Sequence, residues 1–427
     1  MQKIENSTVP QRAAEIRKSS NFSSATVLQK WSFSLLLFYP QAGVLGFGLN
    51  YLIFGVGIAL FLVGVFRLKK MPRHFLKYGA LFFLLFVLHA LLFFLGKSGD
   101  VPARPLFVTG FATVGLILIA GILTRAPDGK SWMYRSILVC LLLEIAIVFL
   151  QFGHMTYGVG LAPRGEDSSY IGLITGSYGN PNNVAVMIAL QVFILHKAGK
   201  FENHPFLTWV LLLGGLLAIF LTLSRTCFFL YILFLILYVF EGKGKKSKSS
   251  ILEGCFKFSV VLILVLAAFS YFQGLINDGN SIVLDRSIAR LSDLTGAGGD
   301  ELISFRQTSH ERLMQNLLSL GLGSFSDLNY GIFLESHDPE LMKVNPHSFL
   351  VEMSFLYGYV GFLLAVSFLA LIAYDLMRAG LSYAYAGFFF IVAIFFQMIP
   401  SSVLSMPAFF LFFVLLASRE SSKEKFA

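Results

Sequence analysis

The chain has 427 residues, of which 56% are hydrophobic and only 13% are charged. Soluble domains carry about 25% charged residues, so this composition excludes a soluble globular protein and predicts an all-α, polytopic membrane protein. The net charge of +9 does not indicate nucleic-acid binding, because the basic residues fall in short segments between apolar runs. The 46 phenylalanines suit lipid-facing helix surfaces, and the three cysteines lack metal-ligand spacing.

Apolar runs long enough to cross a bilayer, which takes about 17–25 residues, recur about twelve times along the chain. They lie near residues 27–46, 49–66, 75–95, 104–124, 132–152, 181–197, 206–223, 225–241, 255–273, 347–374, 381–398 and 402–418. Pro40 and Pro400 leave alternative boundaries for the first two and the last two runs. The sequence therefore predicts a bundle of about twelve transmembrane helices.

The number of lysines and arginines alternates between high and low in successive segments that join these runs. They concentrate in residues 1–30, 67–77, 125–135, 197–202, 243–257 and 419–425. The positive-inside rule then places both termini in the cytoplasm. The expected organisation is transmembrane helices over 1–273, a large outer loop over 274–346, and further transmembrane helices over 347–427.

Four of the five basic residues in the outer loop over 274–346 are arginine. The five are Arg286, Arg290, Arg306, Arg312 and Lys343. Arginine suits bidentate contacts to phosphate or carboxylate, although these side chains can also pair with neighbouring acids of the loop. Within the loop, Thr308 and Glu311 form a possible capping box, with Arg312 in the first turns of the helix that follows. Gly321 or Gly323 is expected to end that short helix.

Three runs begin on the outer side with polar residues in or beside the first helical turn. Asn180-Pro181 precedes Asn183, Arg225 opens another run, and Asn345-Pro346 precedes His347. Asparagine is a preferred N-cap and proline a preferred first helical residue. We therefore expect three helix N-termini on one face of the membrane.

Helix N-termini carry partial positive charge and free N–H groups, so they favour anionic ligands. An arginine added to such a group predicts a site for a strongly anionic ligand such as a diphosphate. The helix dipole favours a neutral imidazole at His347, as a general base requires. We expect neither metal nor cofactor: His310 and His337 match no metal-ligand spacing, and the chain has no Gly-rich phosphate loop.

Each of these residues also has a structural interpretation. The Asn180 start can be ordinary helix capping, Arg225 an interfacial side chain that reaches the headgroups, and His347 a hydrogen-bonded interfacial histidine. Glu144 and Glu352, which lie within apolar runs, are interpreted as buried, hydrogen-bonded structural acids. The coincidence of three polar helix starts on one face favours a functional site.

At these residues the chain resembles the O-antigen ligase and O-antigen polymerase superfamily of bacterial membrane glycosyltransferases. The matching segments are "GSYGNPNNVAV" (176–186), "LTLSRTCFFL" (221–230), "ERLMQNLLSLGLGSF" (311–325) and "NPHSFLVEMSFLYGYVGFL" (345–363). Arg312 and Gly323 reproduce a spacing of arginine and glycine associated with the polymerases.

The resemblance implies about twelve helices in the inner membrane and a metal-independent active site that faces the periplasm. The donor would be an oligosaccharide on undecaprenyl diphosphate, and the acceptor a lipid-linked repeat unit or lipid A-core sugar. Arg225 and Arg312 would hold the diphosphate, and His347 would activate the acceptor hydroxyl. The other candidate substrate-binding residues are Asn180, Asn183, Arg306 and Gly323.

Three further alternatives stay open at this point. Ligases often carry a second polar residue beside the histidine, and the presence of Ser348 there leaves the ligase assignment open. The Arg312–Gly323 spacing and the single histidine slightly favour a polymerase. A polysaccharide transporter would need charged residues along a midplane pathway and two related halves, and the sequence shows neither. An assembly factor for envelope synthesis would tolerate substitution of Arg312 and His347.

Overall fold

The structure is a computed structural model, and every regular element among its described residues is a helix. Those residues are 9–46, 48–65, 72–94, 103–126, 128–163, 173–199, 205–240, 348–399 and 403–418. The predicted run 255–273 and the predicted outer loop 274–346, with Arg306, Arg312 and Gly323, lie outside them, as does His347. The prediction of an all-α fold is confirmed for the described part of the chain.

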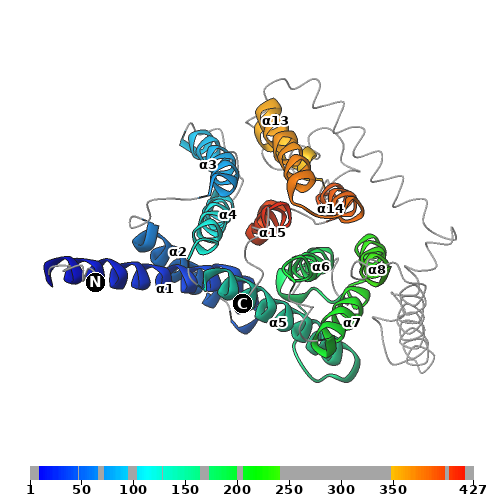
Figure 1. Cartoon of the computed structure of the whole chain (residues 1–427). Helices are drawn as coiled ribbons and strands as arrows, with labels where there is room; N and C mark the ends of the chain where they lie inside the picture. The colour runs from blue at the N-terminus through cyan, green and yellow to red at the C-terminus, as the bar shows by residue number, and fades with distance from the viewer. Residues whose placement is uncertain are drawn as a thin grey trace.

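The helices of Figure 1 follow the predicted apolar runs, except that α1 begins at Val9, well before the predicted run 27–46. They are α1 (Val9–Leu45), α2 (Leu49–Val65), α3 (Arg73–Phe94), α4 (Ala103–Leu123), α5 (Gly129–Tyr157), α6 (Pro181–Lys197), α7 (Pro205–Leu221), α8 (Arg225–Phe240), α13 (Phe349–Arg378), α14 (Tyr383–Phe396) and α15 (Pro407–Ala417). Two short 3-10 turns, η2 (Gly176–Tyr178) and η5 (Val403–Ser405), precede α6 and α15. Pro40 lies inside α1 and does not end it.

Among the described residues, two helical segments are long and apolar enough to cross a membrane: α5 and Tyr359–Arg378 of α13. Several other apolar helices are shorter, among them α8, α14 and α15. This composition is compatible with a membrane protein, while the number of crossings and their orientation stay predictions from the sequence.

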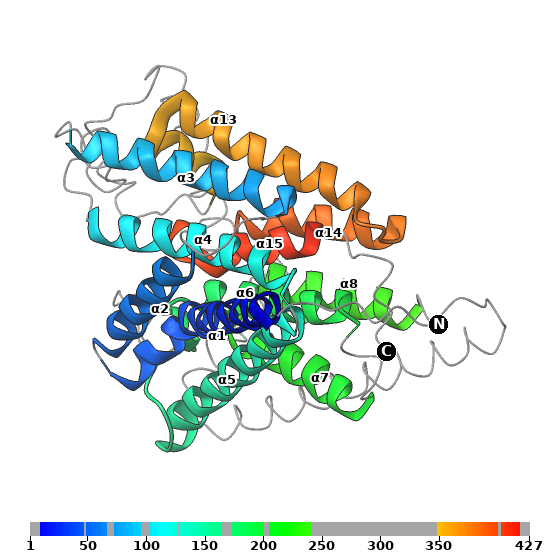
Figure 2. The ribbon, with the colours of Figure 1, turned by 60° about the vertical axis from the view of Figure 1, so that its left-hand side comes forward.

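The short helix α15 forms the centre of the bundle, between α4, α6 and α13 (Figure 1). All of its residues are buried, including Phe409, Phe410, Phe412 and Phe413. The expectation that phenylalanine mainly faces lipid is therefore wrong for this helix, because the core of the bundle uses the same side chain for aromatic packing. The first helix, α1, packs between α4 and α5 (Figure 2).

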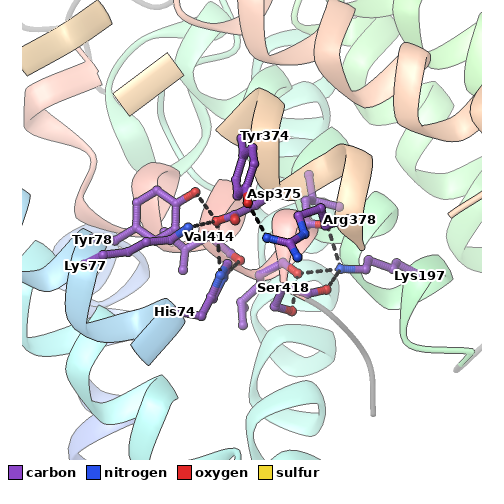
Figure 3. Close-up of polar contacts among 11 residues, drawn as sticks. His74, Lys77, Tyr78, Lys197, Tyr374, Asp375, Arg378, Val414 and Ser418 are labelled. Atoms are coloured by element: carbon purple, nitrogen blue, oxygen red, sulfur yellow. Dashed lines mark hydrogen bonds and ion pairs between the residues drawn. The ribbon is translucent and has the colours of Figure 1, made fainter. Parts of the chain in front are cut away.

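One end of the bundle gathers the start of α3 and the ends of α6, α13 and α15 (Figure 3). His74 of α3 lies 3.2 Å from Asp375 of α13 and 3.0 Å from the Val414 carbonyl of α15. Lys197, the last residue of α6, donates a 2.6 Å hydrogen bond to the Leu416 carbonyl. We call this the charged end.

The opposite end holds the starts of α6 and α8, and we call it the capped end. Phe193 of α6 lies against Tyr231 of α8, and His196, further along α6, lies against Tyr238, further along α8. These pairs show that α6 and α8 run parallel. Both helices therefore begin at the capped end, away from Lys197.

The α13 helix is sharply bent, whereas the sequence suggested one continuous span over 347–374. The rings of Phe349 and Phe368 have centroids 6.0 Å apart, although 19 positions separate them. A straight helix would put them roughly 28 Å apart at about 1.5 Å per residue. A Cβ at Gly361 would overlap the Met353 carbonyl and lie 2.8 Å from the Tyr357 Cβ. The opening segment thus folds back, and glycine permits the close approach.

Candidate functional site

The capped end begins with the N-terminus of α6. Asn180 is the N-cap with extended backbone, and its side chain accepts a 2.9 Å hydrogen bond from the Asn182 backbone N–H. Pro181 is the first helical residue. Asn180 and Asn183 are only 5% and 4% exposed. The predicted Asn-Pro helix start is confirmed, and it is buried inside the bundle.

Glu144 of α5 holds the turn that leads to this cap. Its side chain is 0% exposed. The carboxylate accepts a 2.8 Å hydrogen bond from the Ser177 backbone N–H, a short one from the Ser177 hydroxyl, and a 2.9 Å bond from the Gln41 amide of α1. Burial of a carboxylate is costly unless donors satisfy its oxygens, and these three donors do so. The interpretation of Glu144 as a hydrogen-bonded structural acid is confirmed.

The side chain of Gln151, two helical turns after Glu144, binds the backbone of the same turn. Its Oε1 accepts hydrogen bonds from the Thr175 and Gly176 N–H groups at 3.1 and 2.8 Å, and its Nε2 donates to the Gly176 carbonyl at 3.1 Å. Gly176 has φ of +57°, and a Cβ there would overlap both Glu144 and Val184. This position therefore requires glycine. Two side chains of α5 thus fix the chain just before Asn180.

Arg225 is the first residue of α8, at the same end of the bundle as Asn183. The turn before it contains Leu223 in the left-handed region, with φ of +62°. The Ser224 carbonyl accepts a 2.9 Å hydrogen bond from the Phe228 N–H, which closes the first turn of α8. Arg225 itself is partly exposed. A guanidinium at this position can bind an anionic group at the capped end.

The residues that follow His347 lie deeper than the sequence suggested. Ser348 and Phe349 are buried, and the Phe349 N–H donates a 3.0 Å hydrogen bond to the Gln397 carbonyl at the end of α14. The Phe349 ring packs on Phe368, which is near the midpoint of the segment 359–378. The start of α13 therefore lies within the bundle. Glu352 is also buried, as expected for a structural acid.

The structure thus describes three of the predicted site residues, Asn180, Asn183 and Arg225, and brings all three to one end. The sequence interpretation missed Gln41 and Gln151, although both are amides within largely apolar segments, which is a usable signal. Among the described residues, no group of three or more His, Cys, Asp or Glu side chains is placed to hold a metal ion. The chain matches no protein-family model, no curated protein and no solved structure.

Proposed function

We propose that the protein is an inner-membrane glycosyltransferase of the O-antigen polymerase type, which acts on glycans linked to undecaprenyl diphosphate. The observation that carries the proposal is the parallel arrangement of α6 and α8. It brings the helix N-terminus at Asn180 and Asn183 to the same end as Arg225. Backbone N–H groups, amides and a guanidinium together favour a diphosphate.

The proposed reaction needs charge stabilisation more than acid catalysis. The acceptor hydroxyl oxygen attacks the anomeric carbon of the donor sugar, and His347 takes the hydroxyl proton. The bond from that carbon to the diphosphate breaks, and undecaprenyl diphosphate leaves with the electron pair. Arg225, Arg312 and Arg306 would stabilise the developing charge on the leaving diphosphate.

The same proposal assigns the location and the partners. The capped end would face the periplasm, where the lipid-linked donor and a lipid-linked acceptor meet at the membrane surface. Apolar helix surfaces would accommodate the lipid, while the outer loop, with Gly323 in its expected short helix, would contact the glycan. In the ligase alternative, the acceptor is lipid A-core sugar.

A gel of surface polysaccharide from a deletion strain tests the proposal. Core capped with one repeat unit is the expected result for a polymerase. Naked core, with long polymer retained on the carrier lipid, would assign the ligase reaction instead. An unchanged ladder would contradict both assignments for this polymer.

Variants of Arg312 and His347 distinguish a catalytic role of the protein from a role as an assembly factor. Complementation with Arg312→Ala or His347→Ala should fail at wild-type membrane levels, because each variant loses a group assigned to the reaction. Arg290→Ala and His337→Ala are matched controls in the same outer loop, and both should complement. Full complementation by the first pair would favour an assembly factor.

The bend in α13 favours a second candidate, a polysaccharide transporter. Discontinuous membrane helices often form substrate sites in transporters, and α13 begins inside the bundle beside the end of α14. Proteoliposomes with labelled lipid-linked donor and an acceptor distinguish the two functions. A glycosyltransferase forms a longer glycan, whereas a transporter moves the donor between leaflets and forms no new linkage.

A further inference from the structure

The seam between α3 and α13 at the charged end carries a row of cations. The two helices run antiparallel there: the Tyr78 hydroxyl donates a 2.8 Å hydrogen bond to Asp375, whereas Phe82, further along α3, lies against Phe368, earlier in α13. The Lys77 ammonium lies 5.9 Å from the Tyr374 ring centroid. Arg73 is one turn before Lys77, and Arg378 is one turn after Tyr374. Antiparallel packing therefore places Arg73 opposite Arg378 on the same side of the seam.

Among the described residues of the seam, these cations outnumber the acid. Asp375 forms ion pairs with Lys77 and His74 (Figure 3). Arg73 and Arg378 are exposed, and the Arg378 guanidinium lies 5.1 Å from the Tyr374 ring centroid, within reach of its hydroxyl. Two guanidinium groups and one ammonium thus lie along a seam whose described residues include one carboxylate. Like charges along one seam repel each other, and an anion between them relieves the repulsion.

The two helices also expose apolar side chains next to these cations in the sequence. Leu76 of α3 is 44% exposed, and Met377 and Tyr374 of α13 are 74% and 48% exposed. Exposed apolar side chains beside a tyrosine and basic residues are typical of the boundary between hydrocarbon and headgroups in a membrane protein. A ligand at this place can therefore contact the cations with an anionic group and the side chains with an acyl chain.

We propose that the α3–α13 seam binds the headgroup of an anionic phospholipid through Arg73 and Arg378, with Lys77 and Tyr374 beside it. A lipid fits better than a free phosphate because Leu76 and Met377, next to Lys77 and Arg378 along their helices, are exposed and apolar. Basic sites between helices near a membrane surface are suited to such headgroups. This inference concerns the end of the bundle opposite Asn180 and Arg225, and it does not depend on the proposed reaction.

Lipid titration of the purified full-length protein tests the proposal. Thermal unfolding is followed in detergent micelles with increasing mole fractions of phosphatidylglycerol, or of phosphatidylcholine as the neutral lipid. Phosphatidylglycerol should raise the unfolding temperature until the increase reaches a plateau, and phosphatidylcholine should leave the unfolding temperature unchanged. In Arg73→Gln/Arg378→Gln the half-saturating mole fraction should rise roughly 25-fold, about fivefold for each arginine.

Matched variants make the result specific. Arg125→Gln/Arg135→Gln removes two exposed arginines from the same end of the bundle and should keep the wild-type titration. Arg73→Lys/Arg378→Lys keeps the charge and should retain most of the response. A wild-type titration in the glutamine pair, an equal loss in the control pair, or the same stabilisation by inorganic phosphate would each overturn the proposal.

Discussion

Glu144 and Asp375 are both acids on apolar helices, yet the two ends of the bundle hold them with different partners. Glu144, at the capped end, is fully buried and accepts hydrogen bonds from neutral donors: the Ser177 backbone and hydroxyl and the Gln41 amide. Asp375, at the charged end, is 9% exposed and contacts Lys77, His74 and the Tyr78 hydroxyl.

The difference follows from access to water. Long basic side chains can reach the surface with their charged groups while their stems cover apolar residues, so they suit an acid near the end of a helix. A deeply buried acid lacks that access, and backbone N–H groups satisfy it without adding another buried charge. The acid at the capped end therefore orders a turn, whereas the acid at the charged end joins helices beside an exposed cationic surface.

The largest expected effect is the loss of the acid at the capped end. Glu144→Leu removes the acceptor of three donors, one of them buried and two partly buried, and should lower the free energy of unfolding by about 4 kcal/mol, because donors left without an acceptor inside a protein are costly. Leu143→Ala, at an exposed neighbouring position of α5, should cost much less. Thermal unfolding of the purified variants measures both. Equal losses would show that the hydrogen bonds between Glu144 and its donors contribute little to stability.

The next effect separates backbone strain from steric overlap. Gly176→Ala should destabilise by about 3 kcal/mol, because its positive φ and its contacts with Glu144 and Val184 both oppose a Cβ. Gly158→Ala is the matched control, since Gly158 has φ of +70° and nothing within 4 Å of an added Cβ. The control should lose only about 1 kcal/mol. Equal unfolding midpoints of the two variants in denaturant would contradict the close packing of Gly176 against Glu144 and Val184.

At the charged end, Asp375→Asn tests the ion pairs. The variant keeps an acceptor for Tyr78 but leaves Lys77 without its carboxylate, so the free energy of unfolding should fall by about 2 kcal/mol. Asp128→Asn removes an exposed acid and should change stability little. Salt titration adds a second readout, because added salt should narrow the difference between wild type and Asp375→Asn. If Asp375→Asn lost no more stability than Asp128→Asn, the ion pairs of Asp375 would contribute nothing measurable to stability.

The smallest effect tests the bend in α13. Phe349→Ala and Phe368→Ala should couple by about 1 kcal/mol in a double-mutant cycle, because their rings are in contact. Phe349 and Phe395, an exposed residue of α14, form the comparison pair and should show additive effects. Additivity of Phe349 with Phe368 would indicate a straight α13.

Local features of the fold were predictable from the sequence, whereas contacts between distant segments were not. Hydropathy located the described helices, and the Asn-Pro signature located the start of α6, because both depend on neighbouring residues. The pairs Gln41–Glu144 and Tyr78–Asp375 join positions 103 and 297 residues apart, which no local pattern encodes. The bend in α13 had a local signal in Gly358 and Gly361, but its direction depends on the packing of Phe349 against α15.

The candidate site was predictable to a similar extent. Residue types and spacing indicated Asn180, Asn183 and Arg225, and the parallel packing of α6 and α8 brings them to one end. The hydrogen bonds from Glu144 and Gln151 of α5 to the turn before Asn180 were not predicted, because glutamine and glutamate within an apolar run do not reveal which turn they contact. The roles of Arg312 and His347 stay predictions from the sequence.

The central claim is that the capped end binds the anionic donor, and one comparison of two arginines tests it most directly. Glycan transfer from a lipid-linked donor is measured with purified Arg225→Gln and with Arg125→Gln, which removes an exposed arginine near the charged end. The account predicts a loss on the order of a hundredfold or more in transfer for Arg225→Gln and wild-type transfer for Arg125→Gln. Equal transfer by both variants would contradict it.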